Sequence, residues 1–327
     1  MNGPVLSASK THLLQYVCSF FYFRTAGKWT GSPMKDFLKD YGPYLSALRC
    51  LRSLTLYTVD IHHVDEEALH TCFSAFRETL TELTLGTFVT TFSMFVTLVD
   101  YFPNITALRL SLPSLVPSEG PVPLLSRPLR GKISLRYPVQ TNSREFADEL
   151  AKLDLEYDEL AVKSHSSVSP ELFESQLQIS ASTVKSLKLA FALPVGTSTT
   201  IISHFRQLRE LGLVVIRLHS GYTNLLASIT STELRKVAFS VSFVTDRYTA
   251  SSVKMSWASI DRHLCDLLDR IGRAGYRHTL AVEFRPYEDG GGRKQNLFEL
   301  LPEFGKRGIV TVAETDLNNR YLGVVYP

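Results

Sequence analysis

The chain has 327 residues, of which 44% are hydrophobic and 20% are charged, and its formal net charge at pH 7 is +3. This composition is ordinary for a folded globular protein, and so small a charge argues against a protein built mainly to grip nucleic acid or an anionic membrane. The four scattered cysteines form no CxxC pair, which fits a reducing compartment. With no signal peptide or membrane span in the sequence, we expect an intracellular protein, cytoplasmic or nuclear.

The first fifty residues are the least regular part of the sequence. The run LLQYVCSFFYF (13–23) favours a strand, and MKDFLKDYGPYLSALRC (34–50) favours a helix followed by a turn. We interpret residues 1–50 as a degenerate N-terminal capping repeat, and residues 51–327 as the array that it caps.

One apolar pattern, L-x-x-L-x-L, recurs from residue 51 onward, and its copies around Ile133, Val282 and Val310 are weaker. The middle residues of the copies are Leu54, Leu83, Leu108, Ile133, Leu153, Leu187, Leu211, Val237, Val282 and Val310. Most copies are 20–34 residues apart, near the period of leucine-rich repeats, and one step of 45 leaves room for an insertion or a missed turn. The sequence therefore predicts an α/β leucine-rich-repeat solenoid, with parallel strands inside and helices outside.

Helical spacing fills the intervals between these strands. The apolar residues of 69–76 and of 92–99 recur every three or four positions, and Pro103 should end the helix over 92–101. A further helix is predicted after residue 259, with Ser259 as its cap and Gly275 as its left-handed end. Two stretches interrupt the rhythm and are predicted loops, the proline-rich 111–128 and the glycine-rich 287–296.

The runs LVDYFPNITAL (98–108) and EGPVPLLSRPLRGK (119–132), with LRSLTL, LAKLDLEYDEL and SQLQISASTVKSLKL, resemble the leucine-rich region of fungal F-box proteins. The resemblance covers roughly residues 45–215. It implies a substrate-recognition arm of a cullin-type ubiquitin ligase. Residues 1–50 do not match an F-box, so a ligase adaptor is an expected partner only if an F-box lies outside this chain.

Polar residues that alternate with the buried strand positions should share one concave face. The predicted partner-binding residues are Tyr57, Arg109, Lys132, Arg136, Asp154, Glu156 and Lys188. The three basic residues of neighbouring turns predict a positive patch, which is followed by negative charge at Asp154 and Glu156. We interpret this strip as a surface that recognises charges on a protein partner; a solvated face without a partner is the alternative.

Enzyme signals are weak. Asp154, Glu156, Asp158 and Glu159 crowd four carboxylates together, but Asp154 and Glu156 alternate with leucines and should face solvent. His62 and His63 could bind a metal, but no third ligand follows at a suitable spacing. SHSS (164–167) offers a nucleophile without a base or an orienting group. GGGRK (290–294) lacks the spacing of a phosphate-binding loop. We therefore expect a non-catalytic protein-binding scaffold without cofactor or metal; an α/β enzyme with an unrecognised active site is the alternative.

Overall fold

The computed structural model describes most of the predicted array. The described residues are 16–23, 32–57, 59–61, 66–86, 88–111, 114–116, 124–137, 149–150, 153, 155–164, 177, 181–190, 200–215, 220–241, 250–276, 279–286 and 300–312. They belong to two compact units, Met1–Tyr157 and Asp158–Pro327. Within these ranges, none of the helices combines the length and the apolar run that crossing a membrane requires.

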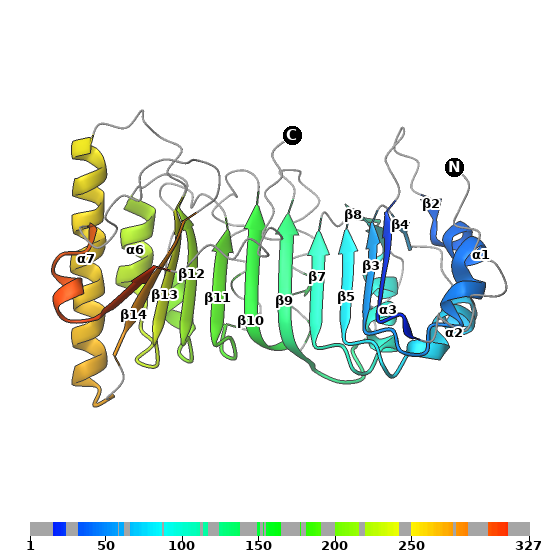
Figure 1. Ribbon diagram of the computed structural model, residues 1–327. Helices are drawn as coiled ribbons and strands as arrows, with labels where there is room; N and C mark the ends of the chain where they lie inside the picture. The colour runs from blue at the N-terminus through cyan, green and yellow to red at the C-terminus, as the bar shows by residue number, and fades with distance from the viewer. Residues whose placement is uncertain are drawn as a thin grey trace. The chain divides into compact units, whose positions relative to one another are not determined.

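The first unit is built on long parallel strands, one from each successive turn of the chain (Figure 1). They pair in the order β1 (Ser19–Phe23), β3 (Ser53–Tyr57), β5 (Glu82–Gly86), β7 (Ala107–Ser111) and β9 (Leu129–Tyr137). Leu54, Leu83, Leu108 and Ile133 are direct partners in this register, and all four are buried. The predicted alternation of buried and polar strand positions is thus confirmed for these turns.

A second, narrower sheet runs through the same turns, and the sequence analysis missed it. Its two-residue strands are β2 (Ser32–Pro33), β4 (Val59–Asp60), β6 (Val89–Thr90) and β8 (Ser114–Leu115). The last of them lies inside the predicted loop 111–128. Each of these turns therefore has two strand segments.

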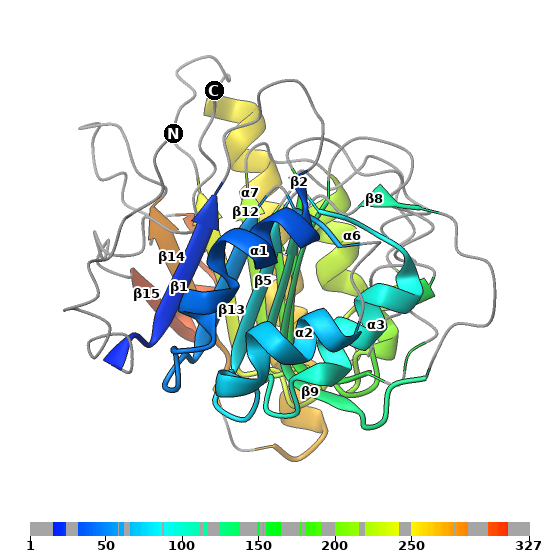
Figure 2. The ribbon, with the colours of Figure 1, turned by 90° about the vertical axis from the view of Figure 1, so that its right-hand side faces the viewer.

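Among the described residues of this unit, three helices cover one face of the long strands, and Figure 2 shows them on the same side. They are α1 (Met34–Leu45), α2 (Glu66–Phe73), which continues as the 3-10 turn η2 (Ser74–Phe76), and α3 (Phe92–Tyr101). Phenylalanines fill the layer between helices and strands: the rings of Phe73, Phe76 and Phe102 are 5.5–6.0 Å apart. Their burial stabilises the stacking of one turn on the next.

The corner after α3 shows how a turn closes. The side chain of Thr91 accepts a hydrogen bond from the backbone N–H of Met94 and so caps the helix. The helix ends at Tyr101, before Pro103, as predicted. Asn104 then donates its side-chain N–H to the carbonyl of Glu78 at 2.7 Å. This bond joins the corner to the preceding turn.

The second unit repeats the parallel arrangement. Its strands pair in the order β10 (Leu155–Ser164), β11 (Ser186–Ala190), β12 (Glu210–Val215), β13 (Lys236–Val241), β14 (Ala281–Pro286) and β15 (Ile309–Val312). The boundary between the units falls inside β10, so Leu155–Tyr157 belong to the first unit. In their described residues the units hold eleven long parallel strands with helices, which confirms the predicted α/β class.

The predicted frame of the turn at 150–155 is wrong. Leu153 is buried but precedes the strand, and Leu160 is the residue that pairs with Leu187. The true copy is Tyr157-x-x-Leu160-x-Val162, and all three residues are buried. Leu160 lies 27 residues after Ile133 and 27 before Leu187, so the irregular spacing of 20 and 34 residues disappears.

The long step of 45 residues is an insertion and not a missed turn, because Val237 and Val282 pair directly. The interval holds helix α7 (Ala250–Arg273), which starts nine residues before Ser259. The prediction that Ser259 caps this helix is therefore wrong, while Gly275 has the predicted left-handed conformation, with φ of 80°. The earlier start was visible in the sequence, because Ala250, Val253 and Trp257 continue the spacing of three and four residues upstream of Ile260.

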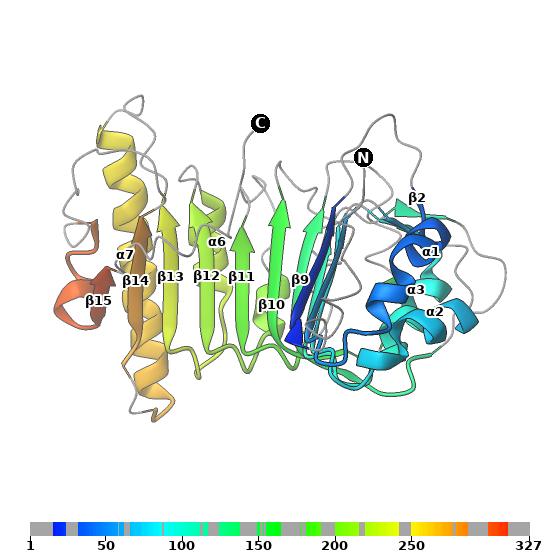
Figure 3. The ribbon, with the colours of Figure 1, turned by 45° about the vertical axis from the view of Figure 1, so that its right-hand side comes forward.

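Helices lie on one side of β12, β13 and β14 in this unit (Figure 3). They are α7 and α6 (Ser220–Ser228); the shorter turns are η3 (Thr200–His204) and η5 (Phe304–Lys306). Trp257 of α7 packs with its ring centroid 5.6 Å from both Phe239 and Phe284. Asp261, which is buried, accepts hydrogen bonds from the backbone N–H groups of Glu303 and Phe304 at 3.0 and 2.8 Å. Its carboxylate thereby ties α7 to the last described turn.

Candidate functional site

The long strands of the first unit turn one face toward the helices and the other away from them. We call the second one the open face. In the register of the five strands its middle row consists of Phe21, Thr55, Thr84, Arg109 and Ser134. Every one of these side chains is exposed or half-buried, because the alternate positions fill the core.

Two aromatic side chains stand at the β1 end of the open face. Phe21 is 63% exposed, and its ring centroid lies 5.7 Å from that of Tyr57. Tyr57 pairs with Gly86 on the next strand, and a Cβ at position 86 would overlap its ring. The absence of a side chain at Gly86 therefore lets the tyrosine ring lie against the strand.

Arg109 is the exposed cation of the middle row. Within the described ranges it makes no hydrogen bond and no ion pair. Lys132, on the neighbouring strand β9, is also exposed and lies opposite Ala107, one row away. Arg136 pairs with Ser111 in the register, but its side chain lies outside the described part. Of the predicted positive patch, Arg109 and Lys132 are thus on adjacent strands of one face.

The predicted negative end of the strip is only partly described. Asp154 lies outside the described residues. Glu156 forms an ion pair with Arg130, with 2.8 Å between Oε2 and Nε. Arg130 was not among the predicted residues, although it occupies the same alternate strand positions as Lys132 in LRGKISLR (129–136). Much of the charge at this end is therefore compensated within the unit.

Lys188 belongs to the second unit, so its surface is described separately from the open face. Its Nζ lies 2.6 Å from Oε1 of Glu159 on β10, and Lys236 and Glu283 form a similar pair on β13 and β14. These pairs join neighbouring strands, as cross-strand ion pairs commonly do. Lys188 is therefore engaged within the protein.

The carboxylate cluster of 154–159 does not converge on one point where it is described. Glu156 pairs with Arg130, Asp158 with Lys185 at 2.7 Å, and Glu159 with Lys188. Each of these acids has its own cation, and no two of them share a partner.

Burial favours the neutral form of three described side chains, the Tyr157 hydroxyl and two thiols. Burial raises the pKa of the Tyr157 hydroxyl, and it also raises the pKa values of the Cys72 and Cys265 thiols. A thiol with a raised pKa is a poor nucleophile at neutral pH. Among the described residues no three metal-ligating side chains gather; His62 and His63, like SHSS beyond Ser164 and GGGRK, lie outside them.

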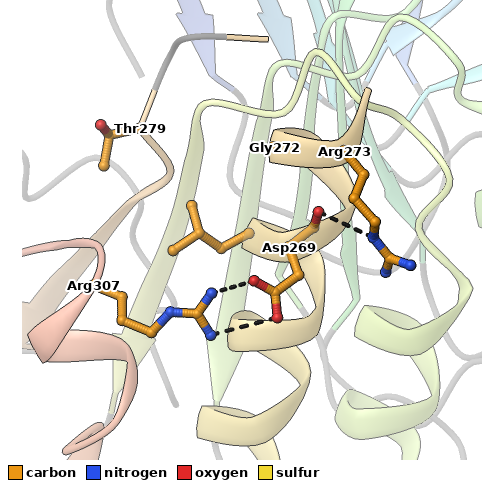
Figure 4. Close-up of a pocket in the computed structure, with 6 residues that line it drawn as sticks. Asp269, Gly272, Arg273, Thr279 and Arg307 are labelled. Carbon is orange, nitrogen blue, oxygen red and sulfur yellow. Dashed lines mark hydrogen bonds and ion pairs between the residues drawn. The ribbon is translucent and has the colours of Figure 1, made fainter. Parts of the chain in front are cut away.

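A surface hollow of about 530 Å³ adjoins the C-terminal half of α7 (Figure 4). It is lined by Leu268, Asp269, Gly272, Arg273, Thr279 and Arg307. Figure 4 shows the guanidinium of Arg307 against the carboxylate of Asp269. The hydrogen bond from Arg307 holds the pKa of Asp269 below its usual value. The carboxylate is thus an ionised partner of the arginine, which suits a structural contact between α7 and the residues after η5.

No protein-family model matches the chain, and a search of curated proteins finds no match either.

Proposed function

We propose that the chain is a non-catalytic protein-binding scaffold, a leucine-rich-repeat solenoid that holds its partner on the open face of the first unit. The observation that carries the proposal is the combination, on one face, of exposed Phe21, of Tyr57 packed on Gly86, and of Arg109, which forms no ion pair with any described residue. Aromatic residues and arginine dominate the binding energy of protein interfaces, because they bury large areas and make directional contacts.

The repeat architecture supports the same proposal. Stacked turns bury their own apolar faces against each other, and the alternate strand positions then present a broad polar surface. The resemblance to F-box receptors extends the proposal: the partner on the open face would be a substrate for ubiquitination inside the cell. A cullin-ligase adaptor would join only through an F-box outside this chain.

The test is affinity capture from a lysate of the source organism, with the tagged full chain as bait and mass spectrometry as readout. The double variant Phe21→Ala/Tyr57→Ala should lower the recovery of the partner by more than about tenfold, because two aromatic anchors are removed. Leu124→Ala is the matched control, since Leu124 is 84% exposed and lies outside the strands. Far-ultraviolet circular dichroism checks that each variant is folded.

Equal recovery by the double variant and the Leu124→Ala control would contradict the proposal. So would a partner whose recovery responds only to substitutions in the second unit.

A further inference from the structure

We infer that the occupant of the open face is an extended acidic protein segment that crosses the strands along the middle row. One of its apolar residues contacts Phe21 and Tyr57, and a carboxylate four residues further along pairs with Arg109. This inference rests on the proposed function, and it names the chemistry and the spacing of the partner's contacts.

The spacing follows from the register. Phe21 on β1 and Arg109 on β7 are in the same row and are separated by β3 and β5. Neighbouring strands are about 4.8 Å apart, so the two positions are about 14 Å apart. An extended chain advances about 3.3 Å per residue and therefore covers this distance in about four residues.

The alternation of side chains along an extended chain is consistent with a spacing of four residues. Side chains of such a chain alternate between its two sides, so residues i and i+4 point the same way. Residue i+2 also points at the open face, and there it meets Thr55 and Thr84. Both side chains are short and half-buried, which leaves room for a small residue and provides hydroxyl groups for hydrogen bonds.

The charges of the open face determine at which position the partner segment carries its acidic residue. Arg109 has no ion pair within the described residues, so a carboxylate there gains a new partner. Glu82 on β5 lies two residues before Thr84 and is half-buried. An acid placed at i+2 would approach this glutamate and be repelled. The positive charge of Arg109 itself disfavours a basic residue at i+4.

A single-stranded nucleic acid is the competing occupant, because bases stack on aromatic rings and phosphates bind arginine. The open face favours the protein segment. Its exposed cations are interrupted by Glu82 and Glu156, whereas a nucleic-acid surface needs a continuous basic track.

The experiment measures fluorescence polarisation of dye-labelled seven-residue peptides titrated with the full chain. The probe has Trp at position 1, Glu at position 5 and Ser elsewhere. The comparison peptides move Glu to position 3, or replace it at position 5 with Gln or Lys. The probe should bind about threefold more tightly than the peptide with Gln, which is the size of one exposed ion pair, and more tightly still than the peptide with Lys.

Arg109 carries this preference if the inference is right. Arg109→Gln should make the Glu and Gln peptides equal, and Arg109→Glu should make the Lys peptide the best binder. Arg235→Glu, the same charge change at an exposed position of the second unit, should leave the order unchanged. Equal affinities across the peptides, an order that survives Arg109→Glu, or tighter binding of an oligothymidine of seven nucleotides would overturn the inference.

The two proposals fail separately. Loss of the captured partner with the aromatic double variant, together with peptides that show no preference, rejects the acidic segment and keeps the binding scaffold. Capture that is indifferent to the aromatic double variant rejects the scaffold's open face itself.

Discussion

Gly86 decides the shape of the open face, although it has no side chain. The ring of Tyr57 occupies the space that a Cβ at this position would fill. The sequence shows a glycine at the end of ELTLG (82–86), but only the strand pairing places it beside the tyrosine. The alternation within each strand placed Tyr57 and Arg109 on one face. The contact between the rings of Tyr57 and Phe21 depends on strand pairing and could not be predicted.

Gly86→Ala should lower the free energy of unfolding by about 1–3 kcal/mol, because the new methyl group must displace a packed ring. It should also weaken partner binding. Gly272→Ala is the matched control: a Cβ there meets no atom within 4 Å, and Gly272 is the second-last residue of α7, so this variant should be at least as stable as the wild type. Urea unfolding of both variants measures the difference. Equal stability of Gly86→Ala and the wild type would mean that Tyr57 does not rest on the strand.

Among the secondary-structure elements, the existence of a strand was easier to predict than which of its residues face the core. Apolar alternation identified the strands around Leu54, Leu83 and Leu108, because only one frame fits each run. The stretch from Leu153 to Val162 offers two overlapping frames, and only pairing with β11 selects the one with Leu160. The two-residue strands of the narrow sheet are too short for any period to be visible.

The contact between α7 and the residues after η5 predicts a pH dependence. Because the folded-state pKa of Asp269 is lowered by Arg307, the unfolded chain binds this proton more readily. The stabilisation is therefore fully present above the ordinary pKa of an aspartate, about 3.9, and is lost as the pH falls through the lower folded-state pKa.

Urea midpoints of the wild type and Asp269→Asn should therefore differ by a constant amount from pH 7 to about pH 4, and should approach each other only as the pH falls further, through the lowered folded-state pKa of Asp269. Asp266→Asn serves as the control on the same helix, since the Asp266 carboxylate is 3.9 Å from His263 and largely exposed. A difference between wild type and Asp269→Asn that stays constant from pH 7 to pH 3 would show that the carboxylate's charge is not what stabilises this contact.

At the scale of the whole molecule, most of the described charges on strand surfaces are satisfied by neighbouring turns. The ion pairs Arg130–Glu156, Lys188–Glu159 and Lys236–Glu283 each join adjacent turns, so these charges are compensated by a neighbour within the protein. The predicted strip treated its charges as one recognition surface. Pairing in space, which no linear pattern reveals, leaves Arg109 and the aromatic pair as the features that distinguish the open face.

Hydroxyl-radical footprinting of the full chain, with and without the captured partner, shows which face the partner covers. Aromatic side chains report their own exposure in this measurement. The partner should protect Phe21 and Tyr57, while Leu124, at 84% exposure, should be oxidised equally in both samples. Unchanged oxidation of Phe21 and Tyr57 in a saturated complex, with protection of Tyr101 on the helical side instead, would contradict binding at the open face.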